Sequence, residues 1–187
     1  SAPRLAAATA ASLSARGFGL VLHPFLGAPG DLDALARRFE ALTGTRALVA
    51  RNHHLRWPGF VDVPVAEAAA GVALNLDTMA VCDGTHPCAA FAGGSLRPMR
   101  FLDAGGRALP ILQQPTAVDD FSLRIRDDAA RARAARALGA RARALLDVAA
   151  RAGGPLVVNA HPVFAALAPD WLRPLVDDGA TRVWSAE

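Results

Sequence analysis

Short apolar runs alternate with alanine-rich helical stretches along the chain, and this alternation is the strongest constraint on its fold. Each run is short, branched and apolar, and is bounded by Gly, Pro or polar residues, which is typical of a buried strand. Strands of this kind separated by helices indicate a parallel sheet covered by helices. The six predicted strands are Gly19–His23, Arg46–Arg51, Val72–Asp77, Ile111–Gln114, Pro155–His161 and Thr181–Ser185.

The predicted helices carry local start and stop signals. The longest begins at Asp127 or Asp128 and runs to about Arg151, where Gly153 and Gly154 end it. Its apolar positions recur at helical spacing, which predicts one buried stripe of Leu138, Ala142, Leu145 and Ala149. The other predicted helices are Arg4–Ala15, Asp31–Gly44, Asp62–Gly71 and Asp170–Asp178.

A chain of 187 residues without a repeat or a linker fits one domain, here residues 1–187. A closed barrel needs more strands than the six predicted. We therefore expect either an open sheet or a barrel whose N-terminal strands would precede residue 1. An irregular stretch of about thirty residues follows Asp77, and a loop of that length is usually functional or holds minor strands. It contains Cys82 and Cys88, for which loop thiols and a small-loop disulfide both stay open, while the spacing matches no zinc-finger pattern.

The apolar stretches and the charge of the chain argue against a membrane span and against a nucleic-acid-binding protein. No uninterrupted apolar stretch reaches the roughly 18 residues of a membrane helix. All 20 basic residues are arginine, but the formal net charge is only +3, which gives weak support for a nucleic-acid partner. The arginines of the long helix favour a solvated face over a phosphate-binding one, so no nucleic-acid partner is expected. There is no signal peptide, and the sequence leaves the localisation open between cytoplasmic and exported.

Polar side chains follow most of the predicted strands. In parallel α/β folds ligands bind at the carboxyl ends of the strands, so several histidines there favour a functional site. No glycine-rich phosphate loop follows a strand and there is no nucleophile-elbow motif. The imidazole, carboxylate, arginine and amide groups that remain suit hydrolysis assisted by a metal or by acid and base groups. These strand-end residues are His23, Arg51, Asn52, His53, Asp77, Gln113, Gln114, Asn159 and His161.

The order of the motifs LHP, RNHHLRW, LNLDT, LQQPT and VVNAHP resembles the later part of the polysaccharide deacetylases, of the chitooligosaccharide deacetylase type. The resemblance spans the chain from about Gly17 to its end. It implies a distorted (β/α) barrel with parallel strands. It also implies a hydrolase that removes an acetyl group from an N-acetylated amino sugar or polysaccharide with a divalent metal, normally zinc.

The resemblance also implies roles for individual residues. His23 matches the first metal-binding histidine, and Arg51 matches the arginine that orients the catalytic aspartate. Asp77 falls where the family has an aspartate that tunes the general acid. His161 matches the histidine that protonates the leaving amine, a role that suits an imidazole because its pKa lies near neutrality.

The chain also departs from the family pattern. The paired aspartates of the family, a base and a metal ligand, lie on a first strand that would precede residue 1. The position of the second metal-binding histidine is Gly27, so His53 or His54 is expected to substitute for it. The sequence therefore leaves two alternatives, a metal-dependent deacetylase or a non-catalytic relative that binds a glycan or a protein partner.

Aromatic and amide side chains complete the predicted site. Trp57 follows a strand end and is the predicted stacking platform for a sugar ring, and Asn159 is predicted to bind substrate as well. Trp171 and Trp184 are expected to pack in the core.

Overall fold

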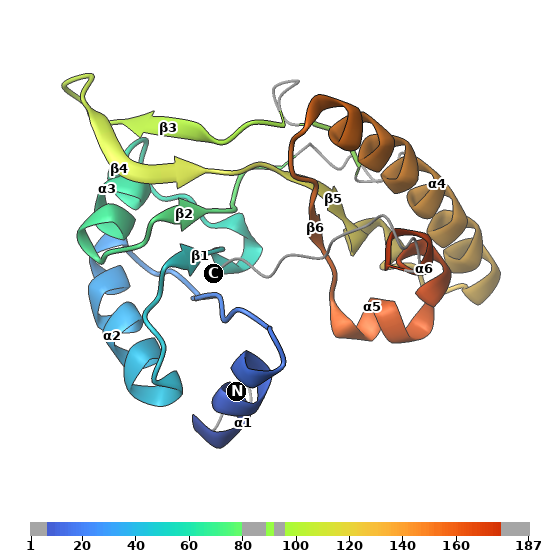
Figure 1. The fold of residues 1–187 in the computed structure, drawn as a ribbon, viewed down its shortest axis with the longest axis horizontal. Coiled ribbons are helices and arrows are strands. Elements are labelled where there is room, and N and C mark those ends of the chain that lie inside the picture. Colours follow the sequence, from blue (N-terminus) through green and yellow to red (C-terminus); the bar gives the residue numbers. More distant parts are fainter. Residues whose placement is uncertain (1–6, 80–88, 92–95, 177–187) are drawn as a thin grey trace. The chain divides into compact units, whose positions relative to one another are not determined.

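The computed structural model describes residues 7–79, 89–91 and 96–176 of the chain (Figure 1). These residues divide into two compact units. The N-terminal unit comprises the described residues up to Asp77 together with Pro98–Gln114. The C-terminal unit comprises the described residues of the ranges Thr78–Arg97 and Pro115–Val183.

A four-stranded sheet organises the N-terminal unit (Figure 1). Its order is β1-β2-β4-β3, and β1, β2 and β4 are parallel with Val49, Leu74 and Leu112 in register. Leu22 adds a parallel bridge to Ala50 of β1. The strands are β1 (Val49–Ala50), β2 (Leu74–Asn75), β3 (Met99–Leu102) and β4 (Ala108–Gln113).

Helices α1 (Ala7–Ala15), α2 (Leu32–Thr43) and α3 (Asp62–Ala69) belong to the same unit. Helix α2 is amphipathic and buries Leu32 and Ala36, and Gly44 ends it in the left-handed conformation at φ 70°. The apolar core of the unit contains residues of the strands and of the helices that pack on them. Its buried members include Leu22, Ala36, Ala47, Ala50, Val72 and Ile111, and a smaller cluster contains Leu26, Leu32 and Val63.

The C-terminal unit contains a β-α-β arrangement of two parallel strands and a long helix. Strand β5 (Thr116–Asp119) leads through α4 (Asp128–Ala152) to β6 (Val157–Asn159). Two short helices follow, α5 (Pro162–Leu167) and α6 (Arg173–Val176).

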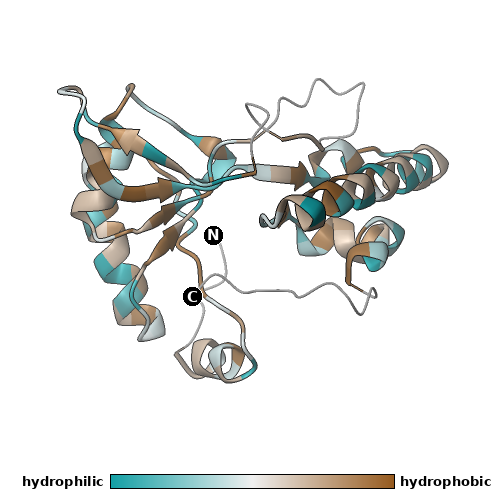
Figure 2. Cartoon of the chain, turned by 45° about the horizontal axis from the view of Figure 1, so that its top comes forward, coloured by the Kyte–Doolittle hydropathy of each residue, from teal (hydrophilic) through white to brown (hydrophobic). Residues whose placement is uncertain are grey.

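Helix α4 is bounded as the sequence predicts. The Asp127 carboxylate accepts a hydrogen bond from the amide of Ala130 at 2.6 Å, and Gly153 ends the helix at φ 64°. The predicted stripe is buried against a core that includes Val118, Leu123 and Trp171. Figure 2 shows mixed hydrophilic and hydrophobic colouring along α4. Its Arg133, Arg136 and Arg141 are exposed.

The mixed α/β fold with parallel strands is confirmed, but the described residues form no closed barrel. Two details of the prediction were wrong. Strand β3 is antiparallel to β4, because the loop between them turns the chain back through Gly106 at φ 77°. The predicted strand Gly19–His23 reduces to the single bridge at Leu22, because pairing with β1 does not continue on either side.

Some predictions fall outside the described residues. These are the strand at Thr181–Ser185, the pairing of Cys82 and Cys88, and the packing of Trp184. Trp171 is fully buried, as predicted. None of the helices in the described ranges combines the length and apolarity that a membrane span requires.

Candidate functional site

The carboxyl ends of β5 and β6 bring four polar side chains together in the C-terminal unit. The two strands are parallel, and after a shift of register between Thr116 and Val118, Asp119 lies opposite Asn159. The Asn159 amide donates a hydrogen bond to Asp119 Oδ2 at 2.7 Å, and Asp119 Oδ1 accepts one from the Phe121 amide at 2.8 Å. This hydrogen bond joins the ends of the two strands. It thereby fixes the positions of Asp120 and His161, which follow the strands.

Asp120 and His161 form the chemically most informative pair in the unit. Asp120 Oδ1 lies 2.5 Å from His161 Nδ1, and Asp120 Oδ2 accepts a hydrogen bond from the His161 backbone amide at 2.6 Å. The Asp120 side chain is fully buried, whereas the His161 side chain is 46% exposed. The carboxylate therefore orients the imidazole with Nδ1 inward, and Nε2 is the nitrogen that can exchange a proton with a bound molecule.

Burial raises the pKa of the Asp120 carboxyl above its ordinary value of 3.8, and the hydrogen bonds from His161 oppose that rise. The Phe164 ring stands edge-on to the imidazole, with centroids 5.8 Å apart. A buried carboxylate behind a half-exposed imidazole is the arrangement that positions a histidine for acid and base catalysis. The sequence predicted His161 but not Asp120, although the adjacent acids Asp119 and Asp120 directly follow an apolar run.

The predicted metal-binding histidines lie together in the N-terminal unit. His23 Nδ1 is 2.6 Å from the carbonyl oxygen of Arg51, so this nitrogen is the donor of the hydrogen bond. The ring centroids of His23 and His53 are 5.2 Å apart. The His53 amide donates to the Pro24 carbonyl at 2.8 Å, which ties the loop of His53 to the loop of His23.

The loop after β1 is strained. His54 and Leu55 both adopt left-handed conformations, with φ of 57° and 51°, which side chains with a Cβ rarely do. The His53 and His54 rings meet edge-on with centroids 4.1 Å apart. The backbone of this loop therefore holds two neighbouring imidazoles in one place.

Arg51 and Asp77 are buried at the ends of β1 and β2. The Arg51 guanidinium donates to the Leu76 carbonyl at 2.7 Å. Asp77 accepts hydrogen bonds from the backbone amide of Asn52 at 2.6 Å and from the Asn75 side chain at 3.0 Å. Burial raises the pKa of the Asp77 carboxyl, and the hydrogen bonds from the asparagines oppose that rise.

Glu67 is a second acidic residue, besides Asp120, that the sequence prediction missed. It is fully buried, and its carboxyl accepts hydrogen bonds from Asn52 at 3.0 Å and from Asn75 at 2.8 Å. Burial and the Asp77 charge raise its pKa from 4.5 to about 7. A single glutamate within the otherwise apolar helix segment of Val63–Ala69 was the available signal.

A zinc-like ion would find only part of its ligand set here. A hydrolytic zinc site takes three protein ligands, and His23 and His53 would supply two imidazole nitrogens. Within the described ranges there is no group of three or more His, Cys, Asp or Glu side chains that could hold a metal ion. The residues at hand therefore do not fit a complete hydrolytic metal centre.

Trp57, the predicted stacking platform, is partly packed. Its indole nitrogen donates to the Phe60 carbonyl at 3.0 Å, and its ring lies against Phe101 with centroids 5.6 Å apart. The indole is half-buried, so only part of its surface can meet a ligand.

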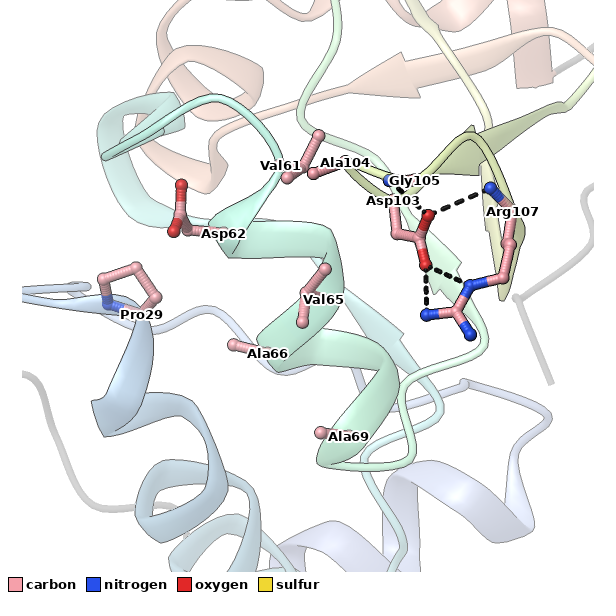
Figure 3. A pocket seen from close by; sticks show the side chains of 10 residues that line it. All are labelled: Pro29, Val61, Asp62, Val65, Ala66, Ala69, Asp103, Ala104, Gly105 and Arg107. Atoms are coloured by element: carbon pink, nitrogen blue, oxygen red, sulfur yellow. Dashed lines mark hydrogen bonds and ion pairs between the residues drawn. The ribbon is translucent and has the colours of Figure 1, made fainter.

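A pocket of about 490 Å³ lies in the N-terminal unit between α3 and the β3–β4 loop (Figure 3). Asp103 and Arg107, which both line the pocket, are paired with each other. Asp103 accepts hydrogen bonds from Arg107 and from the Gly105 amide. None of the predicted site residues lines it. The lining residues are Pro29, Val61, Asp62, Val65, Ala66, Ala69, Asp103, Ala104, Gly105 and Arg107.

The predicted site residues thus fall into two groups. His23, Arg51, His53, Trp57 and Asp77 belong to the N-terminal unit, and Asn159 and His161 belong to the C-terminal unit. The carboxylate that contacts His161 is Asp120. No protein-family model matches the chain, and no curated protein or solved structure matches it either.

Proposed function

We propose that this chain acts as a hydrolase of the polysaccharide deacetylase type, built on the distorted (β/α) barrel of that family. Its reaction removes an acetyl group from an N-acetylated amino sugar or polysaccharide. The observation that carries the proposal is the 2.5 Å contact between the buried Asp120 carboxylate and the half-exposed imidazole of His161. The order of motifs along the chain supports the same family.

His161 acts as the general acid in this proposal. When water has added to the acetyl carbonyl, the carbon–nitrogen bond breaks only if the departing amine nitrogen receives a proton, because an amide anion is a very poor leaving group. The attacking water gives up one proton to solvent as it adds, and the protonated imidazole then donates from Nε2 to the nitrogen as the carbon–nitrogen bond breaks. Acetic acid, the free amine and neutral His161 result. Asp120 is a positioning residue, since it holds Nδ1 and stabilises the charged ring.

The remaining residues support binding and orientation. Arg51 and Asp77 shape the strand ends, and the oxygens of Asp77 are engaged by Asn52 and Asn75. We therefore assign the tuning of the acid to Asp120 and a structural role to Asp77. His23 and His53 would supply only two of the three ligands that a divalent ion, normally zinc, takes in a hydrolytic site. Trp57 in the N-terminal unit and Asn159 in the C-terminal unit are proposed as sugar contacts, each within its own unit.

Acetate release tests this function directly. The full chain is incubated with N-acetylated chito-oligosaccharides, with and without added zinc, and acetate is measured. His161→Gln keeps an N–H donor but cannot carry a proton, so we expect kcat to fall by about 100-fold or more. The melting temperature and the affinity for the oligosaccharide should stay unchanged.

Two results would overturn the proposal. A wild-type chain that binds the oligosaccharide but releases no acetate at any zinc concentration is a glycan-binding protein. If the His161→Gln variant releases acetate at the wild-type rate, His161 is not the general acid.

A further inference from the structure

The N-terminal unit exposes a group of aromatic and basic side chains on the loops that follow Leu22 and β1. We call this group the histidine–arginine patch. All of its members are exposed, and none of them is acidic. The patch consists of His23, Phe25, His53, His54 and Arg56.

Phe25 provides an apolar surface within the patch. Its side chain is 63% exposed, although its ring is in contact with two neighbours. The Arg56 guanidinium lies 4.9 Å from the ring centroid, and the His53 ring lies 5.9 Å away at an angle of 54°. These neighbours restrain the ring and leave most of it accessible, so it can receive the apolar C–H face of a pyranose.

Arg56 provides a fixed positive charge at the edge of this ring. Its position is held by the cation–π contact with Phe25, and within the described ranges no carboxylate forms an ion pair with it. A guanidinium offers a planar set of N–H donors that matches the oxygens of a carboxylate or a sulfate. The charge of Arg56 is therefore available to a ligand.

The backbone holds these groups in place before any ligand arrives. The His53 amide is bonded to the Pro24 carbonyl, and the Leu55 amide is bonded to the Asn52 carbonyl at 2.9 Å. The left-handed residues His54 and Leu55 then turn the chain so that Arg56 reaches Phe25. Strained residues that persist between such anchors are typical of ligand-binding sites, and a preorganised site loses less entropy on binding.

We propose that the histidine–arginine patch binds an anionic sugar, with Phe25 stacking on the pyranose ring and Arg56 pairing with its acidic substituent. This inference rests on the proposed function and names its substrate class, an acetylated polysaccharide that carries carboxylate or sulfate groups. His53 borders the same ring, with its centroid 5.9 Å from that of Phe25.

Calorimetric titration of the full chain tests this proposal with three oligosaccharides of equal length. The probes are an oligogalacturonate, a sulfated galactan fragment and a neutral chito-oligosaccharide. We expect at least one anionic probe to bind more tightly than the neutral one, and its affinity to fall with added salt. The anionic probe that binds more tightly identifies the acidic group.

Two variants separate the contribution of the Arg56 charge from that of the Phe25 ring. Arg56→Gln should weaken binding of the anionic probe by about tenfold, the effect of losing one charge-assisted interaction, and leave the neutral probe unaffected. Phe25→Ala should weaken binding of both kinds of probe. The matched controls are Arg16→Gln and Phe18→Ala, because Arg16 lies 5.3 Å from the half-exposed ring of Phe18. Neither control should change binding by more than about twofold.

Equal affinity for all three probes would overturn the proposal. It would also be overturned if Arg16→Gln weakened binding of the anionic probe as much as Arg56→Gln does. Because binding is measured without turnover, its failure is separable from failure of the hydrolase. Acetate release without a preference for anionic probes would overturn only the proposal that the histidine–arginine patch binds an anionic sugar. Arg56-dependent binding without acetate release would overturn only the proposed hydrolase activity.

Discussion

At the scale of single residues, Asp120 and Glu67 are both fully buried, yet their neighbours give them different tasks. Asp120 contacts a titratable imidazole, so its negative charge stabilises a positive ring next to it. Glu67 shares two asparagine side chains with another acid, Asp77, which disfavours a second negative charge. The first arrangement suits catalysis, and the second couples the protonation state to the stability of the fold.

Asp120→Asn tests the positioning role. The neutral side chain no longer stabilises the positively charged imidazole that donates the proton. We expect kcat to fall by about 100-fold. KM should stay nearly unchanged, and the loss should be much smaller on p-nitrophenyl acetate, whose leaving group departs without a proton. An equal loss on the amide and on the aryl ester would contradict the role, and the exposed Asp170→Asn variant is the control.

Glu67→Gln tests the buried acid pair. The pKa of Glu67 is raised from 4.5 to about 7, so between these values the folded chain holds a proton that the unfolded chain has released. The free energy of unfolding should therefore fall as the pH rises through this interval, by on the order of 3 kcal/mol, and then level off.

Urea unfolding at pH 5 and pH 8 measures this difference. Glu67→Gln should flatten the pH dependence, because the amide has no proton to lose. Glu40→Gln, at an exposed position on α2, should retain the wild-type dependence. A wild-type chain equally stable at both pH values would show that Glu67 is not responsible.

At the scale of elements, helices follow their local signals more closely than strands do. Helix α4 starts and ends as predicted, because its capping residues Asp127 and Gly153 act within one turn. Strands depend on partners far away in the sequence. Strand β5 was therefore missed, and β3 was expected only as one of the minor strands that the stretch after Asp77 could hold. The pairing of Asp120 with His161, 41 residues apart, could not be predicted from either residue alone.

Gly139→Ala tests the packing of α4 on the segment of Trp171. A Cβ at Gly139 would lie 3.0 Å from Trp171 Cα and 3.2 Å from its carbonyl oxygen, and both atoms are backbone. Alanine favours a helix by about 1 kcal/mol over glycine, but the clash should outweigh this gain. We expect a net loss of about 1–3 kcal/mol in the free energy of unfolding.

Gly30→Ala is the matched control, since a Cβ at that position has no heavy atom within 4 Å. It should leave the stability nearly unchanged in the same urea titration. A Gly139→Ala variant more stable than the wild type would mean that the Trp171 backbone shifts to accommodate the added Cβ at little cost in free energy.

At the scale of the whole molecule, each unit carries its own group of candidate functional side chains at strand ends. The N-terminal unit holds Arg51, two of the candidate histidines and two buried acids, namely His23, His53, Glu67 and Asp77, and the C-terminal unit holds Asp120 and His161. The sequence predicted His23, Arg51, His53, Asp77 and His161 because polar residues after apolar runs mark strand ends. It could not predict which acid meets which base, since that depends on how strands pair and on how loops turn.

The dependence of the rate on the leaving group tests the role of His161 most directly. Wild type and His161→Gln are compared on an N-acetylated amino sugar and on p-nitrophenyl acetate. An amine needs a proton to leave, whereas p-nitrophenolate leaves without one. We expect the variant to lose about 100-fold or more in rate on the amide and only a few-fold on the aryl ester. Equal losses on both substrates, or no loss on the amide, would contradict it.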